Sequence, residues 1–124
     1  MNSDDIFAME KLPSDIIVLG GGYIAVEMAQ ILNSLGVKTT IVIRSSPLKI
    51  IDKEVVEVLL QEMRKAGITV MQKTPHTKVE KQPDGNLIVH LKDGNKIRAE
   101  KVLTAIGRPP CTNGLGLEKT GVEL

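Results

Sequence analysis

A glycine motif that follows a run of aliphatic residues constrains this chain more than any other feature. Residues Ile16 to Leu19 are aliphatic, and Gly20, Gly22 and Ala25 follow them in the pattern G-x-G-x-x-A. This pattern, at the end of a strand and the start of a helix, is typical of a dinucleotide-binding turn. Gly20 permits the tight turn, Gly22 lets a pyrophosphate approach the backbone, and Ala25 lets the helix pack closely on the strand. The free N–H groups at the start of the helix would then face the phosphates.

The alternative is an ordinary strand-to-helix turn that binds no ligand, because glycines also occur in such turns. The context favours the dinucleotide site. A strand precedes the motif and an amphipathic helix follows it. A second strand ends about 20 residues further on, as it does in dinucleotide-binding βαβ units.

Hydrophobic periodicity predicts the order β-α-β-α-β, followed by a three-stranded meander and a last strand. The predicted strands span residues 15–19, 38–43, 68–71, 77–81, 87–91, 96–99 and 102–106, and the predicted helices span residues 23–35 and 52–65. The βαβ crossovers imply parallel strands. We therefore expect an α/β fold: a Rossmann-like, three-layer ββα NAD(P)-binding domain, with a central parallel sheet and a three-stranded β-meander on one face.

Each predicted helix has one apolar face that should be buried. These faces consist of Ile24, Met28, Ile31, Leu32 and Leu35 in the first helix, and of Val55, Val56, Leu59, Leu60 and Met63 in the second. We expect residues 1–13 to form a lead-in that connects to the first strand, and residues 14–124 to form a single domain.

The composition predicts an aliphatic core and excludes several classes of site. Hydrophobic residues make up 42% of the chain and aromatic residues only 2%, which suits a parallel sheet covered by helices. The net charge of +1 gives no reason to expect a nucleic acid or a membrane as partner. Cys111 is the single cysteine, and His76 and His90 have no partners at metal-ligand spacing. We expect no metal site, and a reducing, cytoplasmic location because no signal peptide is visible.

The residues after the second predicted strand indicate which dinucleotide binds. NAD and FAD sites usually place an acidic residue there, which accepts hydrogen bonds from the ribose. Here Ile43 and Arg44 occupy this position, and no acid follows before Asp52. Arg44 offers bidentate hydrogen bonds to a 2′-phosphate, and Ser45 and Lys49 add a hydroxyl and a second cation. The pattern predicts NADP(H) rather than NAD, and it argues against FAD in this domain. The alternative is that these are ordinary surface charges.

Three segments together resemble a known family. The segments are Gly20 to Ala29 (Gly-Gly-Gly-Tyr-Ile-Ala-Val-Glu-Met-Ala), Ile43-Arg44, and Thr104 to Pro110 (Thr-Ala-Ile-Gly-Arg-Pro-Pro). They resemble the flavin-dependent pyridine nucleotide-disulfide oxidoreductases, and among these the glutathione reductases. Residues 3–8 are similar to the segment that leads out of the family's FAD domain.

The resemblance implies that this chain is the NADPH-binding domain of a larger enzyme. In the family, the redox-active cysteines lie in an FAD domain and the acid–base pair lies in a dimerisation domain that forms a homodimer. FAD would therefore be bound by the parent and not by this domain, which has no catalytic residues of its own. The parent would be cytoplasmic, with mitochondria as the alternative location. The cofactor-binding residues implied by the motif and the resemblance are Gly20, Gly22, Tyr23, Ile24, Ala25, Glu27, Arg44, Ser45, Lys49, Gly107 and Arg108.

The resemblance also assigns roles to single residues. Tyr23 would cover the nicotinamide pocket, and Glu27 would lie near the nicotinamide and the flavin. Gly107 and Arg108 would lie beside the cofactor. The alternative for Tyr23 is an aromatic residue that packs on the sheet at the start of the helix. The alternative for Gly107 and Arg108 is a plain strand-to-loop turn.

The chain departs from the glutathione reductases in the loop after the second strand. Lys49 stands where a second arginine is usual, and the loop is about one residue shorter. The alternatives to a glutathione reductase are a thioredoxin or trypanothione reductase, dihydrolipoamide dehydrogenase, or a stand-alone NAD(P)-binding redox-sensing module. A purely structural domain would bind no dinucleotide.

Overall fold

The central sheet consists of four parallel strands in the order β3-β2-β1-β7. The computed structural model describes residues 1–122, and the strands are β1 (Asp15–Leu19), β2 (Lys38–Val42), β3 (Thr69–Met71) and β7 (Lys101–Thr104). In the register of the sheet, Ile17 pairs with Thr40 on one side and with Val102 on the other. β1 is therefore a central strand, which explains its unbroken aliphatic sequence.

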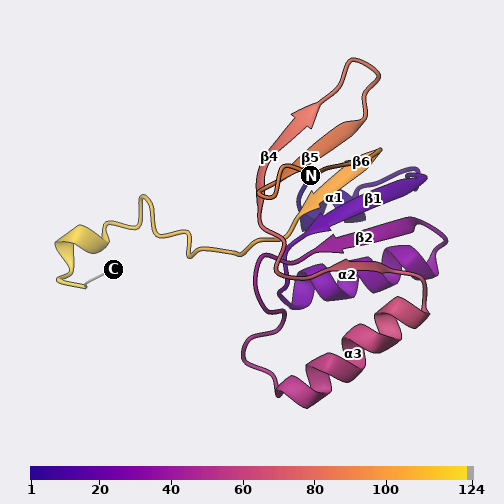
Figure 1. Cartoon of the computed structure of the whole chain (residues 1–124). Coiled ribbons are helices and arrows are strands. Elements are labelled where there is room, and N and C mark those ends of the chain that lie inside the picture. The colour runs from indigo at the N-terminus through magenta and orange to yellow at the C-terminus, as the bar shows by residue number, and fades with distance from the viewer. Residues whose placement is uncertain (123–124) are drawn as a thin grey trace.

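Two helices cover one face of this sheet. They are α2 (Tyr23–Ser34) and α3 (Lys53–Lys65), and Figure 1 shows both on the same side of β1 and β2. The α3 helix begins as the sequence predicts, because the side chain of Asp52 accepts a hydrogen bond from the backbone N–H of Glu54 at 2.8 Å. Each helix connects two parallel strands, as in a βαβ unit.

An antiparallel meander covers the other face of the parallel sheet. Its strands are β4 (His76–Lys81), β5 (Leu87–Leu91) and β6 (Lys96–Ala99). Val89, Leu91 and Ala99 of the meander share a buried cluster with Ile17 and Leu19 of β1. The meander, the parallel sheet and the helices form three layers (Figure 1). The predicted α/β fold with a central parallel sheet is therefore confirmed.

The buried faces of the helices differ from those that the sequence predicts: the face of α2 is shifted, and that of α3 is narrower. The residues of α2 that are buried are Ala25, Val26, Met28, Ala29 and Leu32, and those of α3 are Val56, Leu60 and Met63. The prediction was wrong for Ile31, Leu35 and Val55, which are exposed. Only one layer of helices lies on this face, so the flanks of each apolar stripe remain in solvent.

The N-terminal lead-in has a feature that the sequence did not predict. The lead-in contains a short helix, α1 (Ser3–Phe7), whose first turn is capped by the side chain of Asn2. Met1 lies at the free edge of β7, where its carbonyl oxygen accepts a hydrogen bond from the N–H of Thr104 at 2.8 Å. The α1 helix has only five residues, which is too short for periodicity to reveal it.

The last predicted strand, residues 102–106, ends earlier in the structure, at Thr104. After β7 the chain leads away from the sheets to a 3-10 turn, η1 (Leu117–Lys119) (Figure 1). Residues 123–124 of the predicted domain lie outside the described residues. Among the described residues, no helix has both the length and the apolar sequence needed to cross a membrane.

Two alanine substitutions on the same helix test the buried stripe of α3. Leu60 is 1% exposed, so Leu60→Ala should lower the free energy of unfolding by about 2–5 kcal/mol. Val58 is 57% exposed, so Val58→Ala should change it by about 0.5 kcal/mol or less. Urea denaturation followed by circular dichroism measures both. Equal losses would contradict this placement of α3 on the sheet.

Candidate dinucleotide-binding site

The turn at Gly20 holds the ends of three strands together. The N–H of Gly20 donates to the carbonyl oxygen of Val42, at the end of β2, at 3.0 Å. The N–H of Ala105, just after β7, donates to the carbonyl oxygen of Leu19 at 2.8 Å. A Cβ atom on Gly20 would overlap the carbonyl oxygen of Ala105, and Gly20 has a φ of +142°. Only glycine fits this position, because both the space and the backbone conformation exclude a side chain.

The start of α2 is open to an anion. Gly22 is the N-cap residue, and no side chain caps the first turn. The first intrahelical hydrogen bond runs from the N–H of Val26 to the carbonyl oxygen of Gly22, at 3.1 Å. The preceding N–H groups therefore have no partner within the helix. A Cβ atom on Gly22 would have no neighbour within 4 Å, so its absence leaves room for a ligand at the positive end of the helix.

The other predicted residues of α2 surround this opening. Ala25 is fully buried beneath the turn. Ile24 is half-buried against the helix-side core, the apolar cluster between the parallel sheet and the two helices. Tyr23 is 64% exposed, and Glu27, one turn further along, is also exposed. The aromatic ring of Tyr23 is thus free at the mouth of the turn and does not pack into the core.

Ser45 and Lys49 lie together in a hollow beside the loop after β2. The hollow has a volume of about 490 Å³ and lies between this loop and α3. Lys53, in the first turn of α3, and Gln72, after β3, also line it. Neither residue was among the cofactor-binding residues predicted from the sequence. The available signal for Lys53 was a cation directly after the predicted N-cap Asp52.

Arg44 is exposed at the start of the same loop, but it does not line the hollow. The remaining predicted residues follow β7: Gly107 has a φ of +144°, and Arg108 is exposed. Because β1, β2 and β7 are parallel neighbours, the segments after them leave the sheet at the same edge. The structure thus brings the predicted segments to the carboxyl edge of the sheet, where ligands of open α/β sheets bind.

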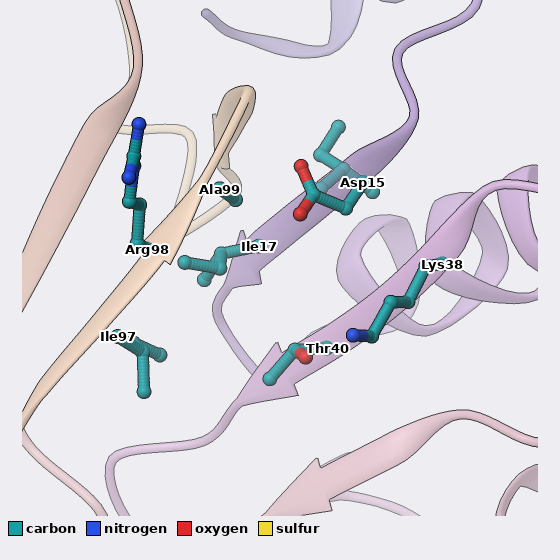
Figure 2. Close-up of a pocket in the computed structure, with 8 residues that line it drawn as sticks. Asp15, Ile17, Lys38, Thr40, Ile97, Arg98 and Ala99 are labelled. Carbon is teal, nitrogen blue, oxygen red and sulfur yellow. The ribbon is translucent and has the colours of Figure 1, made fainter.

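A second, smaller hollow lies between the two sheets. Figure 2 shows its lining residues, which include Asp15 at the start of β1, Lys38 at the start of β2, and Arg98 on β6. Its volume is about 180 Å³, and an oxygen of Asp15 accepts a hydrogen bond from the N–H of Glu100 at 2.7 Å. This hollow lies at the amino ends of β1 and β2, opposite the glycine turn, so we do not assign the dinucleotide to it.

Shifted pKa values occur on the meander and at its end. The pKa of Glu80 is lowered, first by a hydrogen bond from Lys78 at 2.8 Å and then by one with His90 at 3.0 Å. The pKa of Glu100 is lowered because its carboxylate accepts hydrogen bonds from the N–H and the hydroxyl of Ser14. Among residues 1–122, no cluster of His, Cys, Asp and Glu side chains could hold a metal ion.

The pyridine nucleotide-disulphide oxidoreductase family matches this chain over residues 1–124. The chain belongs to this family. Its members are oxidoreductases that use FAD and NAD(P)H.

Two curated relatives differ in name but are similar to the chain to nearly the same degree. Glutathione reductase from Schizosaccharomyces pombe is 38% identical over 125 residues, which cover 99% of this chain and 27% of that protein. Thioredoxin reductase SEP1 from Emiliania huxleyi is 35% identical over 128 residues, which cover 100% of this chain and 26% of that protein. The chain spans about a quarter of the length of these relatives.

A solved structure with the same fold is LpdA from Mycobacterium tuberculosis. It superposes with a TM-score of 0.88 at 27% identity, over 100% of this chain and 27% of that chain. The arrangement of parallel sheet, meander and helices is therefore that of one region of a larger protein in this structural neighbour.

Two substitutions in the glycine motif test the geometry of the turn through their effects on stability. Gly20→Ala should lower the free energy of unfolding by about 3 kcal/mol or more, because strain at a positive φ adds to the overlap with Ala105. Gly22→Ala should cost about 1 kcal/mol or less, because its Cβ atom enters open space. Thermal and urea denaturation measure both. A Gly20→Ala protein as stable as Gly22→Ala would contradict the geometry of the turn.

Proposed function

We propose that the carboxyl edge of the parallel sheet binds NADP(H). The pyrophosphate would lie on the N–H groups at the start of α2, next to Gly22. The 2′-phosphate would bind Arg44, Ser45 and Lys49. The nicotinamide end would lie toward Tyr23. The observation that carries this proposal is the uncapped start of α2, which no side chain obstructs.

The chemistry of the loop after β2 supports NADP(H) over NAD(H). Arg44 and Lys49 are cations of this loop. Lys49 also lines the hollow, together with Lys53 and one acid, Glu57. The first acid after Arg44 is Asp52, whose carboxylate caps α3. No carboxylate at the end of β2 would therefore accept a ribose hydrogen bond or repel a 2′-phosphate. Arginine gives a bidentate contact, and the lysines act as point charges.

The whole protein in our proposal is a disulfide reductase. Residues 14–124 would be its NADPH-binding domain, and residues 1–13 the linker from an FAD domain. NADPH bound here would supply a hydride for the FAD of the parent. The electrons would then pass to a cysteine pair outside this chain, which would reduce the disulfide. The residues of this domain bind and orient the nucleotide and perform no covalent step. The relatives, about four times as long as this chain, support the existence of further domains.

Glutathione disulfide is our first candidate for the substrate, with a parent homodimer formed through another domain. The 38% identity with a glutathione reductase supports it, as does the sequence from Tyr23 to Glu27. The second candidate is the disulfide of thioredoxin, which the 35% identity with a thioredoxin reductase favours. Turnover of glutathione disulfide and of oxidised thioredoxin by the full-length parent distinguishes the two.

Paired calorimetric titrations with NADPH and NADH at low salt test the nucleotide. NADPH should bind at least about tenfold more tightly, a difference of about 1.4 kcal/mol. Arg44→Ala should remove this difference, because the bidentate contact to the 2′-phosphate is lost. Lys96→Ala, which removes one exposed charge from β6, is the control and should preserve it. Equal affinities of the unmodified chain for both nucleotides would contradict the proposal.

A further inference from the structure

We propose that a backbone contact between Gly21 and Leu48 positions the cation loop, defined as residues 44–49, and thereby sets the preference for NADP(H). This inference rests on the proposed function. It assigns a positioning role to Leu48 and to Gly21, the variable position of the G-x-G motif, and neither residue was among the predicted cofactor contacts.

The contact is a hydrogen bond from the N–H of Leu48 to the carbonyl oxygen of Gly21, at 2.7 Å. Leu48 adopts a φ of +42°, a conformation that residues other than glycine rarely occupy. Its neighbours hold it there. Its side chain packs against the helix-side core, and its own carbonyl oxygen accepts a hydrogen bond from the N–H of Ile51 at 2.8 Å.

The two segments also touch at Gly21 and Pro47. A Cβ atom on Gly21 would lie 3.2 Å from the Cα atom of Pro47 and 2.8 Å from Cγ2 of Ile43. Pro47 and Ile43 are both buried. The cation loop therefore packs closely on the glycine turn, because Gly21 has no side chain to hold Pro47 away.

The base of the cation loop is fixed as well. The N–H of Ile43 donates to the carbonyl oxygen of Met71 at 2.8 Å, and the carbonyl oxygen of Ile43 accepts from Thr74 at 3.0 Å. Only residues 44–46 lie between this anchor and the buried Pro47. Arg44 and Ser45 belong to this short span, and Lys49 follows Leu48 directly.

Fixing the loop at both ends gives its charged groups a set position relative to the start of α2. A 2′-phosphate would then meet groups that are already in place, and less conformational entropy would be lost on binding. NADH lacks this phosphate and gains nothing from the ordered loop. The Gly21–Leu48 contact should therefore raise the affinity for NADPH much more than the affinity for NADH.

The test compares Leu48→Pro with Leu48→Gly in the full 124-residue chain. Proline removes the N–H donor and fixes φ near −65°, whereas glycine keeps the donor and accepts the positive φ. In calorimetric titrations, Leu48→Pro should weaken NADPH binding about tenfold and change NADH binding less than about twofold. Leu48→Gly should keep the ratio of the two affinities within about threefold of the unmodified chain.

The inference is overturned if the Leu48→Pro variant still prefers NADPH as the unmodified chain does. It is also overturned if the variant loses affinity equally for NADPH and NADH. Hydrogen exchange of the Leu48 amide in the ligand-free, unmodified chain is a second test that needs no variant. The amide should exchange at least about 100-fold more slowly than that of the exposed Ser45. Equal exchange rates overturn the inference even if Leu48→Pro fails to fold. An unmodified chain without a preference for NADPH contradicts the proposed function instead.

Discussion

The close approach of two backbones at Gly20 is the constraint on which the site depends. A side chain here would overlap the carbonyl oxygen of Ala105, so the segment after β7 can pass the glycine turn only because Gly20 has none. Hydrogen bonds from the turn to Val42 and from Ala105 to Leu19 fix the same three strand ends. The start of α2 and the segments after β2 and β7 are consequently brought to one edge of the sheet.

Backbone N–H groups and cationic side chains both lie at this edge of the sheet. The uncapped N–H groups next to Gly22 offer a fixed partial charge, and Arg44 and Lys49 offer full charges on a loop. Because the chain as a whole carries a net charge of only +1, the anion binding that we propose depends on this local arrangement. In our account the hydrogen bond between Gly21 and Leu48 joins the two parts, since it holds the charged loop against the turn.

The sequence predicted the fold well because its signals are local. Aliphatic runs marked the strands, and the Asp52 cap and the helical periodicity marked α3. The buried face of each helix was only partly predictable. In α2 the small residues Ala25, Val26 and Ala29 face the sheet, and the spacing of the larger apolar residues did not indicate them. In α3 the buried stripe is narrower than the run of apolar residues. Ile31 and Val55 were expected in the core, and both are exposed.

The geometry of the candidate site was predictable where a residue type carries the signal, as at Gly20, where a side chain would overlap Ala105. The role of Arg44 stays a prediction. The geometry was not predictable where the signal is a backbone contact between distant segments. A leucine at position 48 does not indicate a positive φ. It also does not indicate that the N–H of this residue donates to the carbonyl oxygen of Gly21. Lys53 was missed because only the three-dimensional structure shows that the first turn of α3 lines the same hollow as Lys49.

The most direct test of this account is the set of backbone amide chemical shifts that change when the ¹⁵N-labelled chain is titrated with NADPH. We predict that the largest changes fall on residues 20–25 and 44–49, with further changes near Gly107, and that the meander is little affected. Changes centred on Asp15, Lys38 and Arg98, around the hollow at the opposite edge, would contradict the placement of the nucleotide. Shifts that do not change at all would contradict binding itself.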